Sequence, residues 1–265
     1  KENKSISEIL NQVRSARQVI LNEETPEKIE KHWMKVIQWY GKIIWKNSVK
    51  INDTIITAKN IILSTWSHAK LLEIDGLNSS KILTNENIFE ETDNIKEIVI
   101  MWWWYIGCEL AEAFANSWVK VSMIQRNKVL IPNEEVESSK LIQKEFEKKW
   151  IKVYLNTIIQ KAEWNKLILE NRENKSIQKI EFDKILQSLW RQANITNLWL
   201  EENNIDFSEK WIKTDKYNRT SIKNIYAVWD CVENSPMFTH WANNQWRGVI
   251  RNIIFPFIKS SMQKA

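Results

Sequence analysis

The chain has 265 residues, with 38 basic and 33 acidic side chains and a formal net charge of +5 at neutral pH. Apolar residues make up 43% and charged residues 27%, which excludes the disordered, collagen-like and disulfide-scaffold classes and is typical of one or two globular domains. The longest apolar run, Ile98 to Cys108, is well short of the roughly 20 residues that a membrane span needs, so we expect a soluble, cytoplasmic protein without a targeting segment.

Two helices and a set of short strands are predicted in the N-terminal part of the chain. Ser5 and Glu8 have the spacing of a capping box, and apolar residues recur with helical period from there to about Leu21. Thr25-Pro26 indicates the start of a second, short helix. A meander with a hairpin turn at Asn52-Asp53, followed by one buried strand, is predicted from β-rich runs at 34–38, 42–44, 49–51, 54–57 and 60–63.

The central part predicts a parallel sheet. After a polar stretch at 75–94, strands and helices alternate as βαβαβ, which is typical of parallel strands joined by crossover helices. Gly107, Ala111 and Ala115 give the first helix a face of small residues that can lie tightly on the sheet. The strands are expected at 97–101, 119–124 and 151–155, and the helices at 105–116 and 133–149.

The last part repeats the pattern of the first. A second meander with a closing strand is predicted, and then a further strand and a helix, at 157–162, 166–170, 176–181, 184–188, 224–228 and 243–255. Residues 60–67 and 183–191 resemble each other, because each joins an apolar strand to a turn after a meander. We infer two nucleotide-binding units built on one plan.

The composition contains an anomaly. Glycine averages roughly 7% of residues, so about 19 are expected here, yet the chain has 4 glycines and 16 tryptophans. Tryptophans stand where turns ask for glycine, as at Trp118, Trp150, Trp164 and Trp229. If every tryptophan except Trp241 stood for glycine, the glycine count would reach about 19.

We therefore hypothesise that the gene uses UGA for glycine, as some bacterial lineages do, and that the printed sequence reads this codon as tryptophan. The richness in Ile, Lys and Asn, whose codons are rich in A and U, agrees with such a genome. The alternative is a Trp-rich protein whose indoles stack on glycans or single-stranded nucleic acid. Tryptophan codons at 102–104 would contradict the hypothesis.

A candidate phosphate-binding turn lies between a predicted strand and a predicted helix. Residues 102–107 read Trp-Trp-Trp-Tyr-Ile-Gly, and glycine at Trp102 and Trp104 would make them the dinucleotide fingerprint G-x-G-x-x-G. Genuine indoles there would exclude the phosphates. After the second strand, Gln125-Arg126 offers no acid for a ribose 2′-OH, which favours NADPH over NADH, although Arg126 is equally typical of a solvated loop charge.

The chain resembles the pyridine nucleotide-disulfide oxidoreductases, the family of dihydrolipoamide dehydrogenase, glutathione reductase and mercuric reductase. The residues that carry the resemblance are 102–107 with Glu109, the paired turns 65–67 and 189–191, and 227–231, where the family has glycine before Asp230. The tail, 237–257, looks closest to the mercuric-reductase-like branch.

The resemblance implies an α/β fold in which a Rossmann-like NAD(P)-binding domain, with a parallel sheet and a β-meander, is inserted in a partial FAD-binding domain of the same type. It places the FAD-binding domain at 1–92 and 192–265 and the NAD(P)H-binding domain at 93–191. The residues implied in FAD binding are Thr65, Trp66, Ser67, Asp230 on the ribityl chain, and Met237, Phe238, Thr239 and His240 at the pyrimidine end of the ring. Those implied in NAD(P)H binding are Trp102, Trp104, Tyr105 over the nicotinamide pocket, Ile106, Gly107, Glu109 near both rings, Gln125, Arg126 and Trp190.

Parts of the family pattern have no counterpart in this sequence. The first G-x-G-x-x-G and the redox C-x4-C would precede it, and the dimerisation domain with its acid–base histidine would follow it. We therefore expect neither catalytic residues nor metal ligands here. Cys108 and Cys231 do not match the redox pair and are expected to be buried structural thiols, His240 is expected to be structural, and His32 and His68 are expected at the surface.

The implied function is that of an FAD-dependent NAD(P)H oxidoreductase of the disulfide reductase family, which passes hydride to FAD and electrons on to a disulfide or related acceptor. The chain would be a fragment that is inactive alone. A flavin-dependent NADH oxidase without a disulfide relay and the Trp-rich binding protein are the alternatives. The expected partners are the cofactors FAD and NADP or NAD, with no nucleic acid or membrane, and a homodimer only for the full-length parent.

Overall fold

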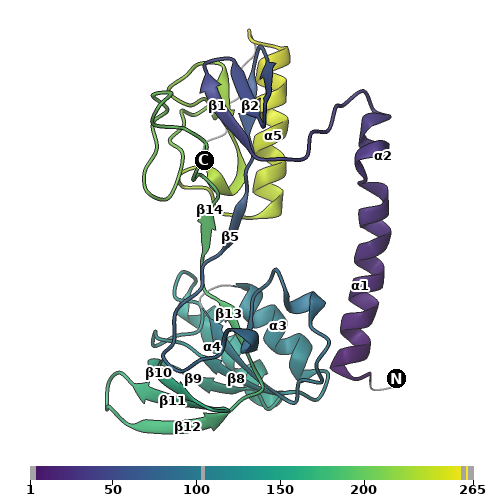
Figure 1. Cartoon of the computed structure of the whole chain (residues 1–265). Helices are drawn as coiled ribbons and strands as arrows, with labels where there is room; N and C mark the ends of the chain where they lie inside the picture. Colours follow the sequence, from purple (N-terminus) through teal and green to yellow (C-terminus); the bar gives the residue numbers. More distant parts are fainter. Residues whose placement is uncertain (1–3, 103–104, 258–260, 262–265) are drawn as a thin grey trace. The chain divides into compact units, whose positions relative to one another are not determined.

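The computed structural model describes residues 4–102, 105–257 and 261. The chain divides into two compact units, which we call unit 1, residues 1–28 and 69–190, and unit 2, residues 29–68 and 191–265 (Figure 1). This is a division by packing, and the assignment of 1–92, 93–191 and 192–265 to cofactor binding stays a prediction. None of the described helices is both long enough and apolar enough to cross a membrane.

Unit 1 is built on a parallel sheet of five strands in the order β6-β13-β7-β8-β9. Its strands are β6 (Ile82–Leu83), β7 (Glu97–Trp102), β8 (Lys120–Ile124), β9 (Lys152–Tyr154) and β13 (Lys184–Ser188), and its crossover helices are α3 (Tyr105–Ala115) and α4 (Val136–Lys148). The predicted βαβαβ order is confirmed. The stretch expected to be only a polar separator contributes the short edge strand β6, because Ile82 and Leu83 pair with β13.

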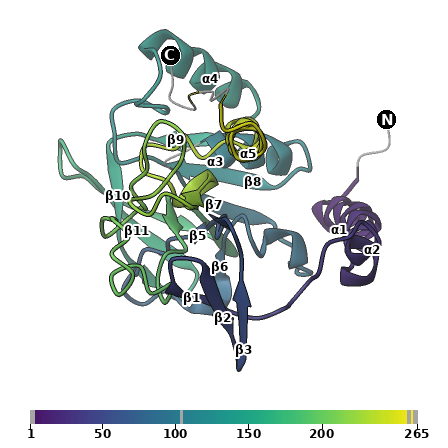
Figure 2. The same cartoon turned by 90° about the horizontal axis from the view of Figure 1, so that it is seen from above.

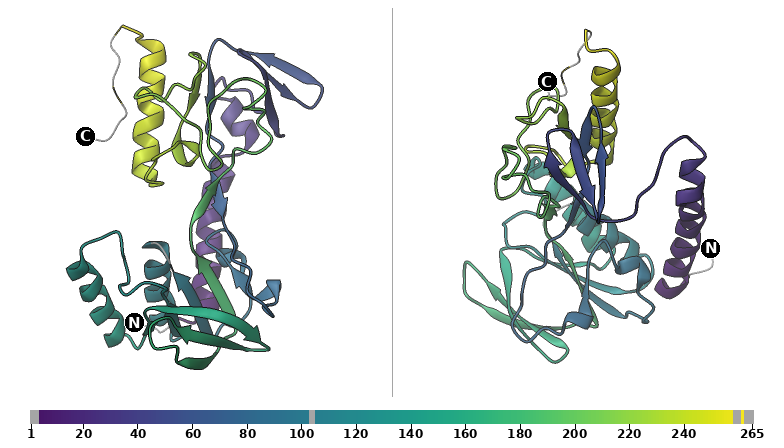
Figure 3. Two further views of the ribbon diagram at one scale, coloured as in Figure 1. Left: turned by 90° about the vertical axis from the view of Figure 1, so that its left-hand side faces the viewer. Right: turned by 45° about the horizontal axis from the view of Figure 1, so that its top comes forward.

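Both faces of this sheet are covered, as Figures 2 and 3 show. Along β7, Ile98 and Ile100 join the core beneath the helices, where Phe114 of α3 is buried. Val99 and Met101 point to the other face, which the meander β10 (Thr157–Glu163), β11 (Lys166–Asn171) and β12 (Ile177–Glu181) covers. The period-two alternation of a strand thus builds a three-layer unit.

The N-terminal helix α1 (Ile6–Glu23) belongs to unit 1. Ser5 caps it, and the reciprocal hydrogen bonds between Ser5 and Glu8 form the predicted capping box. Ile6 and Leu10 are buried in the core of the unit, and Arg14 donates to the carbonyl oxygens of Phe89 and Glu91 at 2.9 Å. The short helix α2 (Pro26–Glu30) begins at the predicted proline.

Unit 2 combines an antiparallel sheet with a parallel strand pair and a helix. The sheet consists of β1 (Gly41–Trp45), β2 (Ser48–Ile51) and β3 (Thr54–Thr57), and the parallel pair of β4 (Ile61–Leu63) and β15 (Ile225–Ala227). The helix is α5 (Thr239–Ile254), drawn in yellow in Figure 1. A ribbon of β5 (Ser67–Ala69) and β14 (Arg191–Ala193) lies at two of the points where the chain passes between the units.

Two expectations for unit 2 are wrong. Residues 34–38 form no strand, since no neighbouring strand pairs with them and neither side of the run is buried. The helix predicted from residue 243 begins at Thr239, and the sequence did not signal this start because the N-cap residue Phe238 offers no capping side chain.

Gly76 allows a test of unit 1. Its φ is +73°, and a Cβ atom at this position would lie 2.2 Å from the carbonyl oxygen of Ala162. Ala162 also donates its N–H to the carbonyl of Asp75 at 2.7 Å, so neither segment can move away without breaking this bond. Gly76→Ala is expected to lower the free energy of unfolding by roughly 2–4 kcal/mol, measured by urea denaturation.

The matched control is Gly41→Ala, whose Cβ would meet only side-chain atoms of Val49 and Ile51. We expect this variant to change the free energy of unfolding by less than about 1 kcal/mol. Equal effects of the two substitutions would contradict the argument.

Candidate functional site

The first candidate site lies in unit 1 where β7 ends and α3 begins. In the strand order of unit 1, β8 and β9 follow β7 on one side and β13 lies on the other, so the carboxyl end of β7 is a topological switch point. Trp102 is the last residue of β7, where its backbone pairs with Ser188, and α3 begins at Tyr105. The strand–turn–helix context that the fingerprint requires is therefore present. The other expected position in the turn, Trp104, lies outside the described residues.

The residues in the first turn of α3 differ in how far they are exposed to solvent. Gly107 is buried, Ile106 is partly buried and Glu109 is exposed. The Tyr105 hydroxyl donates to the carboxylate of Glu134, and this hydrogen bond raises the pKa of Tyr105. Tyr105 is therefore neutral at physiological pH, held at the start of the helix.

Gln125 and Arg126 follow β8, and the structure separates their roles. Gln125 is fully buried, and its Nε2 donates to the carbonyl of Leu130 at 3.0 Å while its Oε1 accepts from the N–H of Asn127 at 3.1 Å. The amide of Gln125 thus shapes the loop. Arg126 is exposed, and its carbonyl accepts from the Arg172 guanidinium at 3.1 Å.

The second candidate site, in unit 2, is a buried charged cluster at the carboxyl end of the β4/β15 pair. Ser67 donates its hydroxyl to the Asp230 carboxylate, and Arg191 Nε lies 2.6 Å from Ser67 Oγ and 3.5 Å from Asp230 Oδ2. A second guanidinium nitrogen of Arg191 donates to the backbone carbonyl of Ser67 at 2.6 Å. Ser67 and Asp230 were expected in one site, whereas Arg191 was missed as a member.

Thr65 and two tryptophans lie at the same strand ends. The buried hydroxyl of Thr65 has no hydrogen-bond partner that meets the distance and angle criteria among the described residues. Trp66 and Trp229 each follow one strand of the pair, with φ of 62° and 71°, and their rings meet edge to face with centroids 5.1 Å apart. Gln245 of α5 accepts the N–H of Trp229 at 2.7 Å, which fixes the turn after β15.

Comparison with known proteins decides which family this geometry belongs to. The model of the pyridine nucleotide-disulphide oxidoreductases matches residues 2–245. The chain belongs to this family.

Curated relatives in the oxidoreductase family are longer than the chain. A mercuric reductase of Staphylococcus aureus is 26% identical over 233 residues, which cover 87% of this chain and 42% of the relative. A dihydrolipoyl dehydrogenase of Mycoplasma genitalium is 29% identical over 222 residues, which cover 82% of this chain and 48% of the relative. The chain thus spans about half the length of these relatives.

A solved structure confirms the fold. The HOCl-induced flavoprotein disulfide reductase RclA from Escherichia coli superposes with a TM-score of 0.87 at 18% identity, over 98% of this chain and 60% of that chain. The expected α/β, Rossmann-like fold with a parallel sheet and a meander is therefore confirmed.

The remaining expected positions of the oxidoreductase pattern lie just before and at the start of α5, and shortly after β13. Met237 has a φ of 55°, Phe238 immediately precedes α5, and Thr239 begins the helix. His240 is exposed in its first turn. Trp190 is partly exposed in unit 1, with Lys70 Nζ 5.8 Å from its ring centroid.

The polar side chains of unit 2 suit the binding of a flavin nucleotide, whereas the tryptophan rings of the unit do not. A buried serine and aspartate, a partly buried arginine and the threonine hydroxyl supply donors and acceptors for a polar cofactor. The rings of Trp66 and Trp229 lie at the strand ends, where ligands of open α/β sheets bind. FAD bound at this edge would meet these two side chains, and we derive no reaction step through this site.

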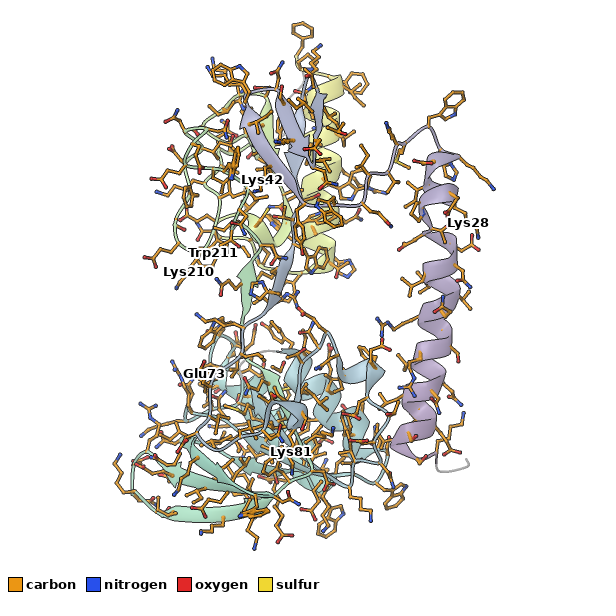
Figure 4. The ribbon with its side chains drawn as sticks, in the orientation of Figure 1. Lys28, Lys42, Glu73, Lys81, Lys210 and Trp211 are labelled. Carbon is orange, nitrogen blue, oxygen red and sulfur yellow. The ribbon has the colours of Figure 1, made fainter. Side chains whose placement is uncertain are left out.

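The described tryptophans are spread over both units. Exposed or partly exposed indoles occur in both units, and single lysines rather than a basic stripe accompany them. Lys42 Nζ lies 5.0 Å from the ring centroid of Trp199 and Lys210 Nζ lies 5.8 Å from that of Trp211 (Figure 4). Neither this pattern nor the family supports the Trp-rich binding protein.

Cys231 and two histidines follow expectation, and Cys108 does so only in part. Cys231 is buried and its thiol donates to the Val228 carbonyl at 3.0 Å, while Cys108 is partly buried, and both are free thiols. His32 and His68 are exposed. Across the described residues, no three His, Cys, Asp or Glu side chains are grouped to hold a metal ion.

The reactivity of Cys108 is a direct test of its surroundings. Burial, with a smaller contribution from the Glu109 charge, raises the pKa of this thiol to about 12. Only the thiolate reacts with iodoacetamide, so at pH 8 roughly one thiol in ten thousand is reactive. We expect alkylation of Cys108 to be about a thousandfold slower than that of a free cysteine. Mass spectrometry of the Cys108 peptide measures the rate. Rapid labelling of the folded chain, matching that in urea, would contradict this.

Proposed function

We propose that the chain is the nucleotide-binding part of a flavoprotein in which NAD(P)H reduces FAD and electrons pass to a disulfide or related acceptor. The observation that carries the proposal is the match of residues 2–245 to the oxidoreductase family, together with the strand–turn–helix at the switch point of unit 1. In this proposal 93–191 bind NAD(P)H, and 1–92 with 192–265 bind FAD. The fragment is inactive alone, and the full-length parent is a homodimer.

The residues of each site have distinct tasks in this proposal. The start of α3 binds the pyrophosphate of NAD(P)H through its N–H groups. Asp230, held by Ser67 and Arg191, accepts hydrogen bonds from the flavin ribityl hydroxyls, and the hydroxyl of Thr65 gains the partner that it lacks. The N-terminus of α5 would lie at the pyrimidine end of the flavin ring, where the positive end of the helix dipole favours negative charge.

The experiment is performed on the full-length protein, obtained by extending the reading frame in both directions. The proposal expects a C-x4-C motif upstream and a yellow product whose flavin absorption is bleached by NADPH without oxygen. A colourless protein that gains no flavin when FAD is added would overturn the proposal. If NADH bleached the flavin in a protein without the cysteine pair, the function of an NADH oxidase would replace this proposal.

Preference for NADPH is assigned to Arg126, the first exposed cation after β8. In the full-length protein, Arg126→Ala is expected to raise the KM for NADPH about tenfold and to leave the KM for NADH unchanged, because only NADPH carries a 2′-phosphate. Lys128→Ala is the matched control, since Lys128 is an exposed cation in the same loop that pairs with Glu173 at 3.3 Å. An equal loss with both nucleotides would assign Arg126 to the loop and not to recognition.

A further inference from the structure

Seven tryptophans have a backbone conformation that tryptophan rarely adopts. Among the described residues, fifteen that are not glycine have a positive φ, and nearly all of them are Asn or Trp. Asn tolerates this left-handed region because its side chain is short and polar, whereas a bulky residue there is an outlier. The tryptophans are Trp33, Trp66, Trp118, Trp150, Trp164, Trp199 and Trp229, with φ between 55° and 71°.

Three of these tryptophans end helices. After α3, the N–H of Trp118 donates to the carbonyl of Ala115 and that of Val119 to Phe114, and after α4 the bonds from Trp150 to Glu147 and from Ile151 to Phe146 repeat this pattern. This is the Schellman motif, whose left-handed position is usually glycine. Trp33 follows α2 with a bond from its N–H to the carbonyl of Glu30.

A fourth tryptophan lies in a two-residue hairpin loop. Glu163 pairs with Lys166, so Trp164 is the first residue of the loop between β10 and β11, with a φ of 55°. The hairpin between β2 and β3 places Asn52, with a φ of 51°, at the equivalent position. Hairpins of this length prefer glycine or asparagine there, so one hairpin follows the rule and the other carries an indole.

No packing accounts for the exposed members of the set. The exposed fractions of Trp33, Trp118, Trp150 and Trp164 are 100%, 76%, 90% and 96%. These side chains gain no burial that would offset the left-handed backbone. They also lie at separate turns, so they form no stacking platform.

We propose that residues 33, 66, 118, 150, 164, 199 and 229 are glycine in the protein that the organism makes, inserted at UGA codons. Four of these positions, 33, 118, 150 and 164, lie at helix ends and a hairpin outside the expected cofactor sites. The inference therefore does not depend on the proposed function. At 66 and 229 it has a functional consequence, since it removes the two rings from the strand ends of unit 2.

The direct experiment combines the gene with the native protein. The seven codons are read from genomic DNA, and tryptic peptides of the protein from its own organism are analysed by tandem mass spectrometry. UGA at the seven positions with glycine in the peptides is expected. Tryptophan in the peptides at these positions, or UGG in the gene, would overturn the proposal whether or not the protein binds flavin.

A second experiment tests the preference for glycine at a left-handed position, in the chain that carries tryptophan there. Trp164→Gly is expected to raise the melting temperature by roughly 2 °C or more, and to raise it above that of Trp164→Ala, since glycine adopts positive φ without the strain that alanine has there. The matched site is Leu141, exposed in the middle of α4, where alanine is expected to be more stable than glycine. The same order of alanine over glycine at both sites would overturn the inference.

Discussion

Glycine at both 66 and 229 is expected to tighten the binding of FAD to the chain by roughly a hundredfold or more. The rings of Trp66 and Trp229 meet at the carboxyl ends of β4 and β15, so the double variant opens the edge at which ligands of α/β sheets bind. It leaves the cluster of Ser67, Asp230 and Arg191 and the unpartnered hydroxyl of Thr65 in place. Either single variant leaves one ring and is expected to gain much less.

The measurement is a titration of the chain with FAD, followed by quenching of flavin fluorescence. The control is the double variant Trp118→Gly with Trp150→Gly, which relaxes two left-handed residues of unit 1 without touching the strand ends of unit 2. We expect its FAD affinity to equal that of the printed chain. Equal affinity of the 66/229 variant would show that the flavin does not bind at this edge, and it would leave the codon result unaffected.

Elements governed by local chemistry were predictable from the sequence. The capping box of Ser5 and Glu8 and the turn at Asn52 depend on residues close in the chain, and both were found where expected. The apolar strand β7 was also predictable, since its two faces serve two different cores. Hydrogen bonds between close residues decided the first two cases, and the apolar character of both faces decided the third.

Features governed by distant contacts were missed. Strand β6 is two residues long and exists because β13 lies beside it. Arg191 joins Ser67 and Asp230 only through folding, because the three residues are far apart in the chain and the paired turns 65–67 and 189–191 did not indicate which side chains would meet. Conversely, residues 34–38 have a strand-like composition but no neighbouring strand. Pairing, and not propensity, decides such short segments.

The tryptophans show that a local rule can be right about the backbone and wrong about the residue. Turn chemistry predicted left-handed positions at 118, 150, 164 and 229, and all four have a positive φ. A sequence that specifies its fold consistently does not place indoles at these positions. The conflict therefore lies between the printed residues and the fold, and not within the fold.

Glycine at 102 and 104 is expected to give the chain an affinity for NADPH that the printed sequence lacks, with a Kd lower by roughly a hundredfold. Residue 102 ends β7, the strand at the switch point of the sheet, and α3 begins at Tyr105. A pyrophosphate reaches the N–H groups of that helix only over a main chain without side chains. The enhanced fluorescence of bound NADPH measures the affinity.

Three controls separate this effect from general stabilisation. The variant with glycine at 118 and 150 relaxes the same unit elsewhere and is expected to bind no NADPH. Adding Arg126→Ala to the 102/104 variant is expected to weaken NADPH about tenfold and NADH not at all, because Arg126 is the exposed cation that follows β8. Inorganic phosphate is expected to compete with both nucleotides. The 102/104 variant could fold with unchanged circular dichroism and still bind neither nucleotide. In that case the turn between β7 and α3 is not the dinucleotide site, whatever residues the organism inserts there.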